Sequence, residues 1–403
     1  MRFYFGPGNN SLSHILKCLS IMDILSSRGH EVFIAIGQKY SGFLKKLGTP
    51  YFILPDIQET DDSGFPSFKW FSNPKYVLEC IKKETELLRR LNPDRALGVF
   101  NFTLQISAGI AGIPYDSLIC GCMLKESKDI LGFHGDEPEK EIQKVNIQTF
   151  FNYATQKMNR ALGEISKIKI NDIRDLLKGD MTFLWDFPEF MPLPLTHNFL
   201  YLGPISYHNK NCQSMDTDEF FYTKNPLVVI SFGTCSGDKD VLVRLTKICL
   251  ESGFAVFIAA GGQKAFLSLF QAEPRVKTSL FTDLIPILRR ACLLITHGGQ
   301  ITVFEALKAK VPVLVMPFQP EQAHNGICLE RIGCGELLIP PKPFRTGSRV
   351  YIDAFNGIKD NEIADRIRNL SKDPQTAENL LKIRHTLEKY TGADQLASVL
   401  ERA

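Results

Sequence analysis

The feature that most constrains the fold is an alternation of short apolar runs with apolar-periodic segments. The chain opens with "MRFYFG", a run typical of a β-strand, which leads into a Gly/Asn/Ser loop. A helical periodicity follows from His14 to about Arg28, and "RGHEVFIAIG" then turns into a second strand. Strands that alternate with helices are typical of parallel, doubly wound sheets, so the chain is predicted to begin with a βαβ unit.

The same alternation starts again in the second half of the chain. Pro-rich "DFPEFMPLPLTHNFLYLGPI" (186–205) breaks the first pattern, and polar "SYHNKNCQSMDTDEFF" follows it. The segments "PLVVISFG", "AVFIAAG", "ACLLITHGG" and "VPVLVMP" are then predicted as strands, separated by helical stretches such as "DVLVRLTKICLES" and "QITVFEALKAK". With 403 residues, 44% of them apolar, the chain is long enough for two cores.

We therefore predict an α/β protein with two facing Rossmann-like, doubly wound domains. The predicted parts are an N-terminal domain over 1–205, a linker over 206–224, a C-terminal domain over 225–380, and a helical segment over 381–403 that packs back on the first domain. Ligands of such sheets bind outside the carboxyl ends of the strands, so the site is expected in a cleft between the domains.

Charge and composition narrow the classes of partner. The formal net charge is +3 and the charged residues are mixed along the chain, so no basic stripe indicates nucleic acid. No signal peptide and no apolar run of the roughly 18 to 20 residues that a membrane span needs is recognised, so a soluble, cytoplasmic protein is expected. Cys18, Cys249 and Cys292 lie in apolar patterns, where a free cysteine behaves as a small hydrophobe. Cys120 and Cys122 have no partner pair at metal-ligand spacing and are predicted to be core thiols.

The turn after the predicted strand "ACLLIT" has the chemistry of an anion site. Gly298 and Gly299 allow a tight turn and a close approach of the backbone to a ligand. The helix that starts near Gln300 offers unpaired amides and the positive end of its dipole. The sequence lacks the lysine of a P-loop and the G-x-G-x-x-G of a dinucleotide fold, so a different phosphate-binding turn is predicted.

Side chains around this turn extend the predicted site. His297 can donate to a phosphate oxygen, Thr302 can add a hydroxyl, and Glu305 lies one turn further on the same helical face, where it could accept hydrogen bonds from a ribose diol. Glu321 and Gln322 stand at the start of the next helix, and a carboxylate beside an amide suits the vicinal hydroxyls of a sugar. Each residue alone is compatible with a structural role, whereas their combined spacing favours a nucleotide-sugar site.

These residues carry a family resemblance. The segment "THGGQITVFEALKAKVPVLVMPFQPEQAHNG" resembles the donor-binding signature of glycosyltransferase family one, the UDP-glycosyltransferase type, and the Pro-rich segment is similar to that of bacterial macrolide and natural-product members. The resemblance implies the GT-B architecture and inverting transfer of a hexose from a UDP-sugar, or a dTDP-sugar, to a hydroxyl or related nucleophile of a small apolar acceptor. It implies no metal and no other cofactor.

The resemblance also implies roles for single residues on the donor side. His297 and the backbone of Gly298, Gly299, Gln300 and Thr302 would hold the diphosphate, with help from Thr234 in "VVISFGT". Glu305 would bind the ribose, Glu321 and Gln322 the hexose, and Phe281 or Ile285 of "LFTDLIP" would flank the base. Glu321 stands where the family often has aspartate.

The loop "GPGNNSLSH" leads to a candidate base in the first half. His14 falls near a helix start, where the dipole disfavours imidazolium, and a neutral imidazole can take a proton from an acceptor hydroxyl. In the family, a histidine sixteen residues before the "RGH" turn is the general base. Asn101 stands where the family usually has the aspartate that orients this histidine, and Asp116 is a possible substitute. His30 is predicted to be structural.

Two other functions remain open at this point. Asn101 in place of aspartate is compatible with a non-catalytic nucleotide-sugar-binding partner of another enzyme. The aromatic segment "GFPSFKWF" (64–71) is compatible with a peripheral membrane transferase that acts on a lipid-linked acceptor, although the same residues could be ordinary core. The "DTD" of Asp216 to Asp218 resembles a metal-binding motif of a different glycosyltransferase architecture, but in a polar linker it is interpreted as a solvated acidic run.

Overall fold

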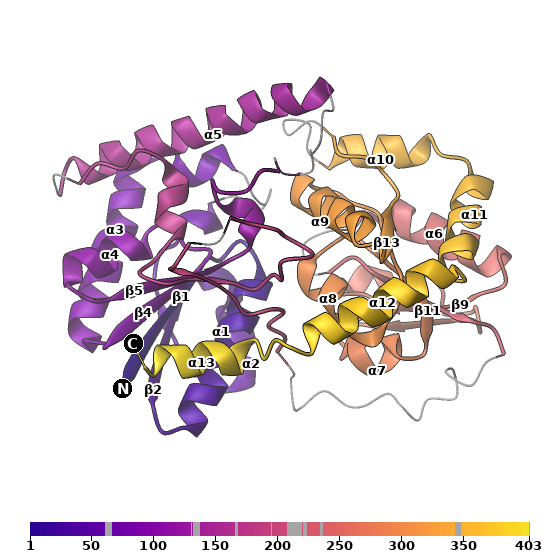
Figure 1. Cartoon of the computed structure of the whole chain (residues 1–403), viewed down its shortest axis with the longest axis horizontal. Coiled ribbons are helices and arrows are strands. Elements are labelled where there is room, and N and C mark those ends of the chain that lie inside the picture. The colour runs from indigo at the N-terminus through magenta and orange to yellow at the C-terminus, as the bar shows by residue number, and fades with distance from the viewer. Residues whose placement is uncertain are drawn as a thin grey trace. The chain divides into compact units, whose positions relative to one another are not determined.

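The computed structural model forms two compact units, each described by itself (Figure 1). The structure describes residues 1–60, 67–129, 131, 138–165, 168–194, 196–207, 220, 224–233, 237–342 and 348–402. The first unit comprises Met1–Ile130, His134–Tyr207 and Tyr390–Ala403, and the second comprises Leu131–Phe133 and His208–Lys389. The last helix of the chain therefore belongs to the first unit.

The first unit is built on a seven-stranded parallel sheet. Its strands lie in the order β3 (Phe52–Ile53), β2 (Glu31–Ile36), β1 (Arg2–Pro7), β4 (Arg95–Val99), β5 (Tyr115–Ile119), β6 (Thr182–Leu184) and β7 (Phe199–Tyr201). The predicted βαβ opening is confirmed. The Pro-rich segment was expected to break the pattern, yet it contains β7. As the last strand of the sheet, β7 pairs only with β6, and an edge strand tolerates nearby prolines.

The helices of the first unit pack on this sheet or on one another. They are α1 (Leu12–Ser27), α2 (Ser41–Leu47), α3 (Pro74–Leu91), α4 (Leu104–Ala111), α5 (Pro138–Leu162) and α13 (Ala393–Leu400). Helix α13 packs against α1 (Figure 1), and Glu401 just after it accepts from His30 at 2.8 Å and from Arg28 at 2.7 Å. His30 thus has the structural role predicted for it.

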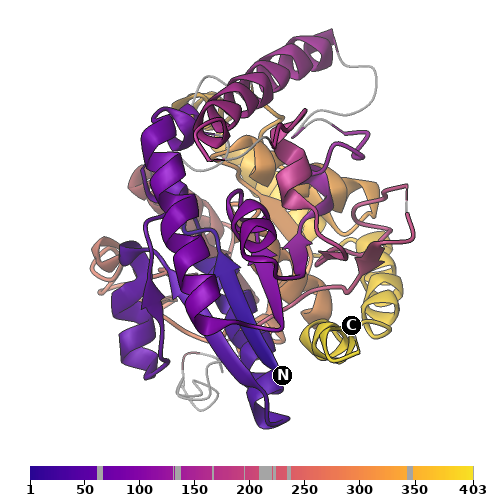
Figure 2. The same cartoon turned by 90° about the vertical axis from the view of Figure 1, so that its left-hand side faces the viewer.

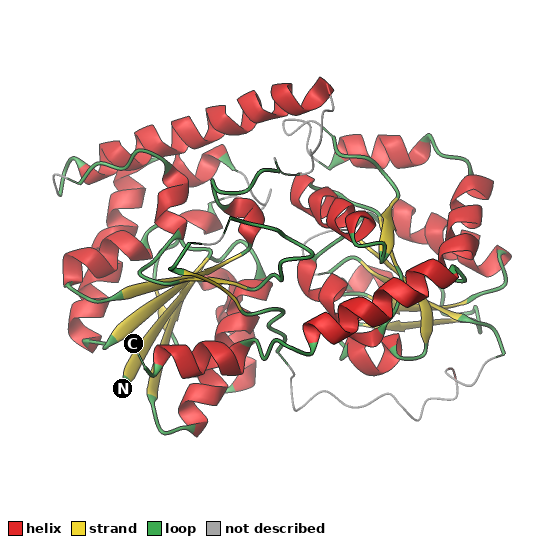
Figure 3. Ribbon diagram, viewed as in Figure 1, coloured by secondary structure: helices red, strands yellow, loops and turns green. Residues whose placement is uncertain are grey.

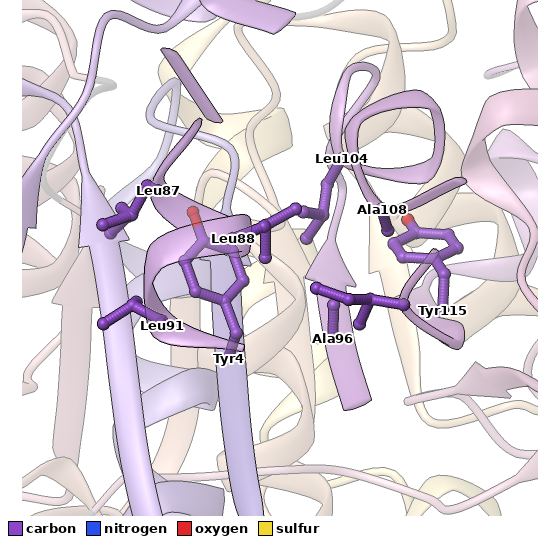
Figure 4. Packing of buried hydrophobic residues seen from close by; sticks show 10 residues of the cluster. Tyr4, Leu87, Leu88, Leu91, Ala96, Leu104, Ala108 and Tyr115 are labelled. Carbon is purple, nitrogen blue, oxygen red and sulfur yellow. The ribbon is translucent and has the colours of Figure 1, made fainter. Parts of the chain in front are cut away.

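One core of the first unit lies between the sheet and helices α3 and α4 (Figures 2 and 4). The strands contribute Tyr4, Ala96 and Tyr115, which share one face because side chains alternate along a strand. The helices contribute apolar side chains at helical spacing, namely Leu87, Leu88, Leu91, Leu104 and Ala108. This packing holds the ends of β1 and β4 next to each other.

The second unit repeats the design with a six-stranded parallel sheet (Figure 3). The order is β10 (Val276–Ser279), β9 (Ala255–Ala259), β8 (Leu227–Ser231), β11 (Ala291–Thr296), β12 (Val313–Val315) and β13 (Gly335–Leu337). The helices are α6 (Lys239–Glu251), α7 (Leu284–Leu288), α8 (Gln300–Ala309), α9 (Pro320–Arg331), α10 (Arg349–Asn356), α11 (Asp360–Leu370) and α12 (Pro374–Leu387). The predicted strands and helices of this half are confirmed, and β10 and β13 are additional.

Each sheet has a point where the strand order reverses. In the first unit it lies between β1 and β4, where Pro7 pairs with Val99. In the second it lies between β8 and β11, where Ser231 pairs with Thr296. Ligands of doubly wound sheets bind at such switch points, beyond the carboxyl ends of the strands. The loops that leave β1, β4, β8 and β11 are therefore where a site is expected.

The described cysteines are free thiols, and Cys18, Cys120 and Cys249 are buried as predicted. Cys122 is only partly buried, so its assignment to the core is wrong, and Cys292 is a free thiol that is partly buried as well. Cys122 follows the end of β5, and Cys292 stands near the start of β11, where strand burial is incomplete. Among the described residues, no helix is both long and apolar enough to cross a membrane.

Candidate active site

His14 lies in the first turn of α1, beyond the carboxyl end of β1. Its Nδ1–H donates to the carbonyl oxygen of Gly8 at 3.1 Å, which leaves a lone pair on Nε2. The side chain is 8% exposed, and burial, with a smaller effect of the Lys17 charge, lowers its pKa to about 3. The ring is neutral at pH 7 as predicted, but burial is the largest cause.

Aromatic rings and a lysine surround this histidine. The centroid of the His14 ring lies 5.2 Å from that of Phe100 and 6.0 Å from that of Trp185. Lys17, which is 3% exposed, places its Nζ 4.4 Å from the centroid of the Trp185 ring. The sequence analysis missed all three residues. The spacing of Lys17 from His14 on one helix could have indicated it, whereas Trp185 is 171 positions away and only the fold brings it here.

Asn101 does not orient His14, which corrects the prediction made for it. Its Oδ1 accepts from the backbone amides of Thr103 at 2.8 Å and Leu104 at 2.9 Å, and its Nδ2 donates to the carbonyl oxygen of Gly6 at 3.2 Å. The side chain therefore fixes the start of α4 to β1. Both of its polar atoms are engaged with backbone, and the His14 ring is held by Gly8 instead.

Asp116 is not a substitute orienting group either. Its carboxylate forms an ion pair with Arg95 at 2.7 Å and accepts from the amide of Met181 at 2.9 Å. The ion pair joins β4 to β5, and the hydrogen bond from Met181 joins β5 to the start of β6. Asp116 is therefore a structural residue of the sheet.

The glycine turn after β11 is as tight as predicted. Gly298 has φ +93°, and a Cβ added there would lie 2.6 Å from the carbonyl oxygen of Gln322. A side chain at this position would be both strained and obstructed. Within the described residues, no side-chain hydrogen bond caps the N-terminus of α8 at Gly299. The turn thus brings the start of α8 and the start of α9 together.

His297 lies between two glycine backbones. A Cβ added to Gly299 would lie 2.4 Å from its Nε2, and one added to Gly233 would lie 3.0 Å from the same atom. Its Nδ1 lies 3.5 Å from the carbonyl oxygen of Ser231 and 3.3 Å from Thr296 Oγ1. Burial lowers its pKa to about 4, so the ring is neutral and needs a proton on Nε2 before that atom can donate to phosphate. Thr234, predicted to assist it, lies outside the described residues.

Glu305 occupies α8 one turn beyond Thr302, and both are partly exposed. Burial, and to a smaller extent the negative charge of Asp283, raises the pKa of Glu305 to about 7 against the opposing effect of Lys308. Helices α7 and α8 pack against each other. Asp283 and Lys308 were not recognised from the sequence, although Lys308 lies only three residues from Glu305.

The segment before α7 carries the two residues predicted to flank the base. Phe281 is 64% exposed, and its ring lies against Gly262, where an added Cβ would lie 2.7 Å from Phe281 Cζ. Ile285 is partly exposed in α7, and its amide donates to Asp283 Oδ1 at 3.1 Å. An exposed aromatic ring beside a glycine backbone can stack on a planar base.

The start of α9 is bound to the glycine turn. Asn325 donates from Nδ2 to the carbonyl oxygen of Gly298 at 2.9 Å. Gln322 is buried, and its Oε1 accepts from the amide of Phe318 at 2.8 Å, so this oxygen is already used to shape the loop. Glu321 is partly exposed in the first turn of α9. The structure therefore brings Glu321 and Gln322 close to the glycine turn after β11. Asn325, which the sequence analysis missed, holds the start of α9 to that turn through its hydrogen bond to Gly298.

Two features from the sequence do not add to the site. In "GFPSFKWF", Trp70 is 1% exposed and Phe71 is fully buried, while Phe68 packs on Phe150 with ring centroids 5.3 Å apart. The described part of this segment is thus largely core, contrary to the membrane-patch hypothesis. Asp216 to Asp218 lie outside the described residues. In the part of the chain that is described, no three His, Cys, Asp or Glu side chains form a candidate metal site.

Comparison with known proteins identifies relatives of this chain. The glycosyltransferase family 28 C-terminal domain matches residues 241–339, which lie in the second unit. The PGL/p-HBAD biosynthesis rhamnosyltransferase of Mycobacterium bovis is 25% identical over 81% of this chain and 74% of its own length. The NDP-glycosyltransferase YjiC of Bacillus subtilis is 27% identical over 90% of this chain and 91% of its own length.

Solved structures share the fold over the full length. The glycosyltransferase of kitacinnamycin has a TM-score of 0.77 at 16% identity and covers 100% of this chain and 98% of its own. The Streptomyces sp. SF2575 glycosyltransferase SsfS6, solved with thymidine diphosphate, has a TM-score of 0.67 at 16% identity and covers 100% of both chains. The chain thus shares the GT-B fold of these glycosyltransferases, and part of its second unit matches the glycosyltransferase family 28 C-terminal domain.

Proposed function

We propose that this protein is an inverting glycosyltransferase that moves a hexose-type sugar from a nucleoside diphosphate to a hydroxyl, or a related nucleophile, of a small apolar acceptor. The observation that carries the proposal is the placement of two chemical groups at the switch points of the two sheets. His14, a neutral histidine with a lone pair on Nε2, follows β1. The glycine turn at the N-terminus of α8 follows β11.

The donor is assigned to the second unit. The start of α8 and a neutral His297 that carries its proton on Nε2 suit the diphosphate, and Glu305 suits the ribose diol. Glu321 and Gln322 are assigned to the sugar, and Phe281 or Ile285 to the base. Helix amides and His297 can offset the diphosphate charge, so we propose that no metal is needed. A ribose diol offers Glu305 two hydroxyls where deoxyribose offers one, which favours UDP. Because SsfS6 was solved with thymidine diphosphate, dTDP is the comparison to make.

The acceptor is assigned to the first unit. His14 takes the acceptor proton on Nε2 while the acceptor oxygen attacks the anomeric carbon from the side opposite the leaving diphosphate. That in-line geometry inverts the anomeric centre. The apolar rings of Phe100 and Trp185 beside His14 support an acceptor of apolar character.

The experiment that tests this proposal combines ligand binding with product detection. We expect UDP, with EDTA present, to raise the melting temperature, because a ligand that binds only the folded state stabilises it. We also expect mass spectrometry to detect a glycosylated acceptor, and NMR spectroscopy of that product to show the anomeric configuration opposite to that of the donor. Tight binding of UDP-sugars without transfer to any acceptor would favour the non-catalytic binding protein instead.

A further inference from the structure

Two cysteines that the candidate active site does not use lie side by side after β5. The Sγ atoms of Cys120 and Cys122 are 3.6 Å apart, so the two free thiols are in contact without being bonded. The sulfur atoms of a disulfide are about 2.05 Å apart, so these two need to approach each other by only about 1.5 Å. Cα atoms two positions apart span at most about 7 Å, and disulfides join Cα atoms roughly 4.4 to 6.8 Å apart. The pair is therefore placed to form a disulfide.

The backbone turn that carries these thiols is fixed by its neighbours. The amide of Met123 donates to the carbonyl oxygen of Cys120 at 3.1 Å, and the amide of Gly121 donates to Asp186 Oδ2 at 2.6 Å. Asp186 is 1% exposed, so the second of these bonds is buried. Because the turn already holds the two sulfur atoms together, their reaction does not carry the entropy cost of bringing separate molecules into contact.

The residue between the cysteines has to be small. A Cβ added to Gly121 would lie 2.8 Å from Leu193 Cδ1 and 2.9 Å from Met191 Cγ, so a larger residue would push the turn away from its support. Glycine also leaves the backbone free to adopt the conformation that a small disulfide ring requires. Gly121 therefore allows the turn to be closely packed and still to adjust when the two sulfur atoms bond.

The two thiols differ in their access to solvent. Cys122 is partly buried, whereas Cys120 is 4% exposed. A dissolved disulfide thus reaches Cys122 first, and the buried Cys120 is in contact with the sulfur that has reacted. An accessible thiol beside a second, resolving thiol is the arrangement that redox-active cysteine pairs use.

A metal accounts for the pair less well. A structural zinc ion takes four ligands from cysteine, histidine or acidic side chains. Within the described ranges, no three such side chains gather at one place, so these two thiols have no further ligands beside them.

We propose that Cys120 and Cys122 form a reversible dithiol/disulfide site whose reaction partner is a small-molecule disulfide of the glutathione class. The inference is independent of the proposed function. The site adjoins the candidate base, because Asp186 follows Trp185, whose ring centroid lies 6.0 Å from that of His14.

The reaction has two exchange steps. The thiolate of Cys122 attacks one sulfur of oxidised glutathione, whose S–S bond breaks, and the released glutathione thiolate takes up the proton that Cys122 lost. Cys120 then gives up its proton and attacks the Cys122 sulfur of the mixed disulfide, and the second glutathione leaves with that proton. The two protein thiols lose two electrons in total, and one glutathione disulfide is reduced to two thiols.

The test follows one tryptic peptide of the full chain. Cleavage after Arg95 and Lys125 gives peptide 96–125, in which Cys120 and Cys122 are the only cysteines. The reduced protein is incubated with an excess of oxidised glutathione, stopped with acid, freed of glutathione, alkylated with iodoacetamide in denaturant, and analysed by mass spectrometry. We expect this peptide to be lighter than its reduced form by two hydrogen atoms and to carry neither an alkyl group nor glutathione. Dithiothreitol, added before alkylation, should restore two thiols that alkylate.

Two controls accompany this measurement. Peptide 291–308 contains Cys292 as its only cysteine, and this thiol is also partly buried. It has no second thiol to close on, so it should carry an alkyl group or glutathione. In Cys120→Ser the resolving thiol is gone, so peptide 96–125 should retain glutathione on Cys122.

The outcomes distinguish a reactive pair from two adjacent structural thiols. A parental peptide 96–125 that takes two alkyl groups after the incubation would overturn the proposal. So would a parental peptide that keeps glutathione on Cys122, because Cys120 would then not resolve the mixed disulfide. A Cys120→Ser peptide without glutathione, beside a parental peptide that closes, would overturn the order in which the two thiols react.

Discussion

Asn325 donates a hydrogen bond from Nδ2 to the carbonyl oxygen of Gly298 at 2.9 Å, and this bond joins the start of α9 to the glycine turn after β11. Both helix starts that are assigned to the donor thus depend on one buried amide. Asn325→Asp replaces the amide group that donates this hydrogen bond by a carboxylate, which would face the carbonyl oxygen of Gly298. We expect a loss of about 1 to 3 kcal/mol in the free energy of unfolding, measured by urea denaturation, and weaker UDP binding by calorimetry.

The matched control for this change is Asn379→Asp. Asn379 also donates from Nδ2 to a glycine carbonyl oxygen, that of Gly333 at 3.1 Å, but it lies on α12, and its other hydrogen-bond partner is Gln375, which is not assigned to the donor. UDP affinity in this variant should stay at the parental level. If both variants lose UDP binding equally, the Asn325 bond has no special role in the donor site.

Gly299→Ala tests the position of His297 without straining the backbone. Gly299 has φ −61°, which alanine adopts freely, but its new Cβ would lie 2.4 Å from His297 Nε2. The imidazole must then move away from the start of α8. We expect UDP affinity, measured by calorimetry, to fall roughly tenfold or more, the effect of losing one charged hydrogen bond. Gly109→Ala, where no atom lies within 4 Å of the new Cβ, is the control and should bind UDP normally.

Glu305→Gln should change how stability depends on pH. The pKa of Glu305 is raised from 4.5 to about 7 in the folded protein, so the folded state holds this proton more tightly than the unfolded state. Its contribution to stability is therefore present below about pH 4.5 and is lost as the pH rises towards 7. The amide introduced by the substitution cannot ionise, so the melting temperature of the variant should exceed that of the parent at pH 8 by more than at pH 5.

The same variant separates the ribose assignment from a purely structural role. An ionised Glu305 is the better hydrogen-bond acceptor for a ribose diol, so parental UDP affinity should rise as the pH passes through about 7. In Glu305→Gln this rise should disappear and the affinity should be lower at pH 8. Identical pH profiles of UDP affinity in the two proteins would remove Glu305 from the donor site.

Asn101→Asp should weaken the fold without improving catalysis. The Nδ2 group that donates to Gly6 O at 3.2 Å would become a carboxylate oxygen facing that carbonyl, in a buried position. We expect about 1 to 3 kcal/mol of destabilisation by urea denaturation. A clear rise in transfer rate would instead indicate that the new carboxylate reaches His14, as the family pattern suggested.

Much of the fold, and the proximity of the residues proposed for the donor side, could be predicted from local sequence. Residues near one another in the chain, such as His297 and Glu305, carry their geometry with them once the strand–turn–helix unit is recognised. The ring contacts of His14 could not be predicted from local sequence. Phe100 follows β4 and Trp185 follows β6, and only the packing of the fold brings these two rings to His14. The role of Asn101 was mistaken because a family position was read without its hydrogen bonds, which engage Gly6 and α4. Strands β6, β7 and β13 have three residues each, and unlike β12, which is equally short, they do not lie in a long apolar run that could indicate them.

The role of His14 as the base of glycosyl transfer is tested most directly by His14→Ala, assayed with a UDP-sugar and 4-chlorophenol at about pH 7, where a phenol still holds its proton. His385→Ala, at an exposed position on α12, is the control. We predict that transfer falls by about 10²- to 10⁴-fold in His14→Ala, that UDP still raises its melting temperature as in the parent, and that His385→Ala behaves as the parent in both assays. Transfer by His14→Ala at the parental rate would contradict the account.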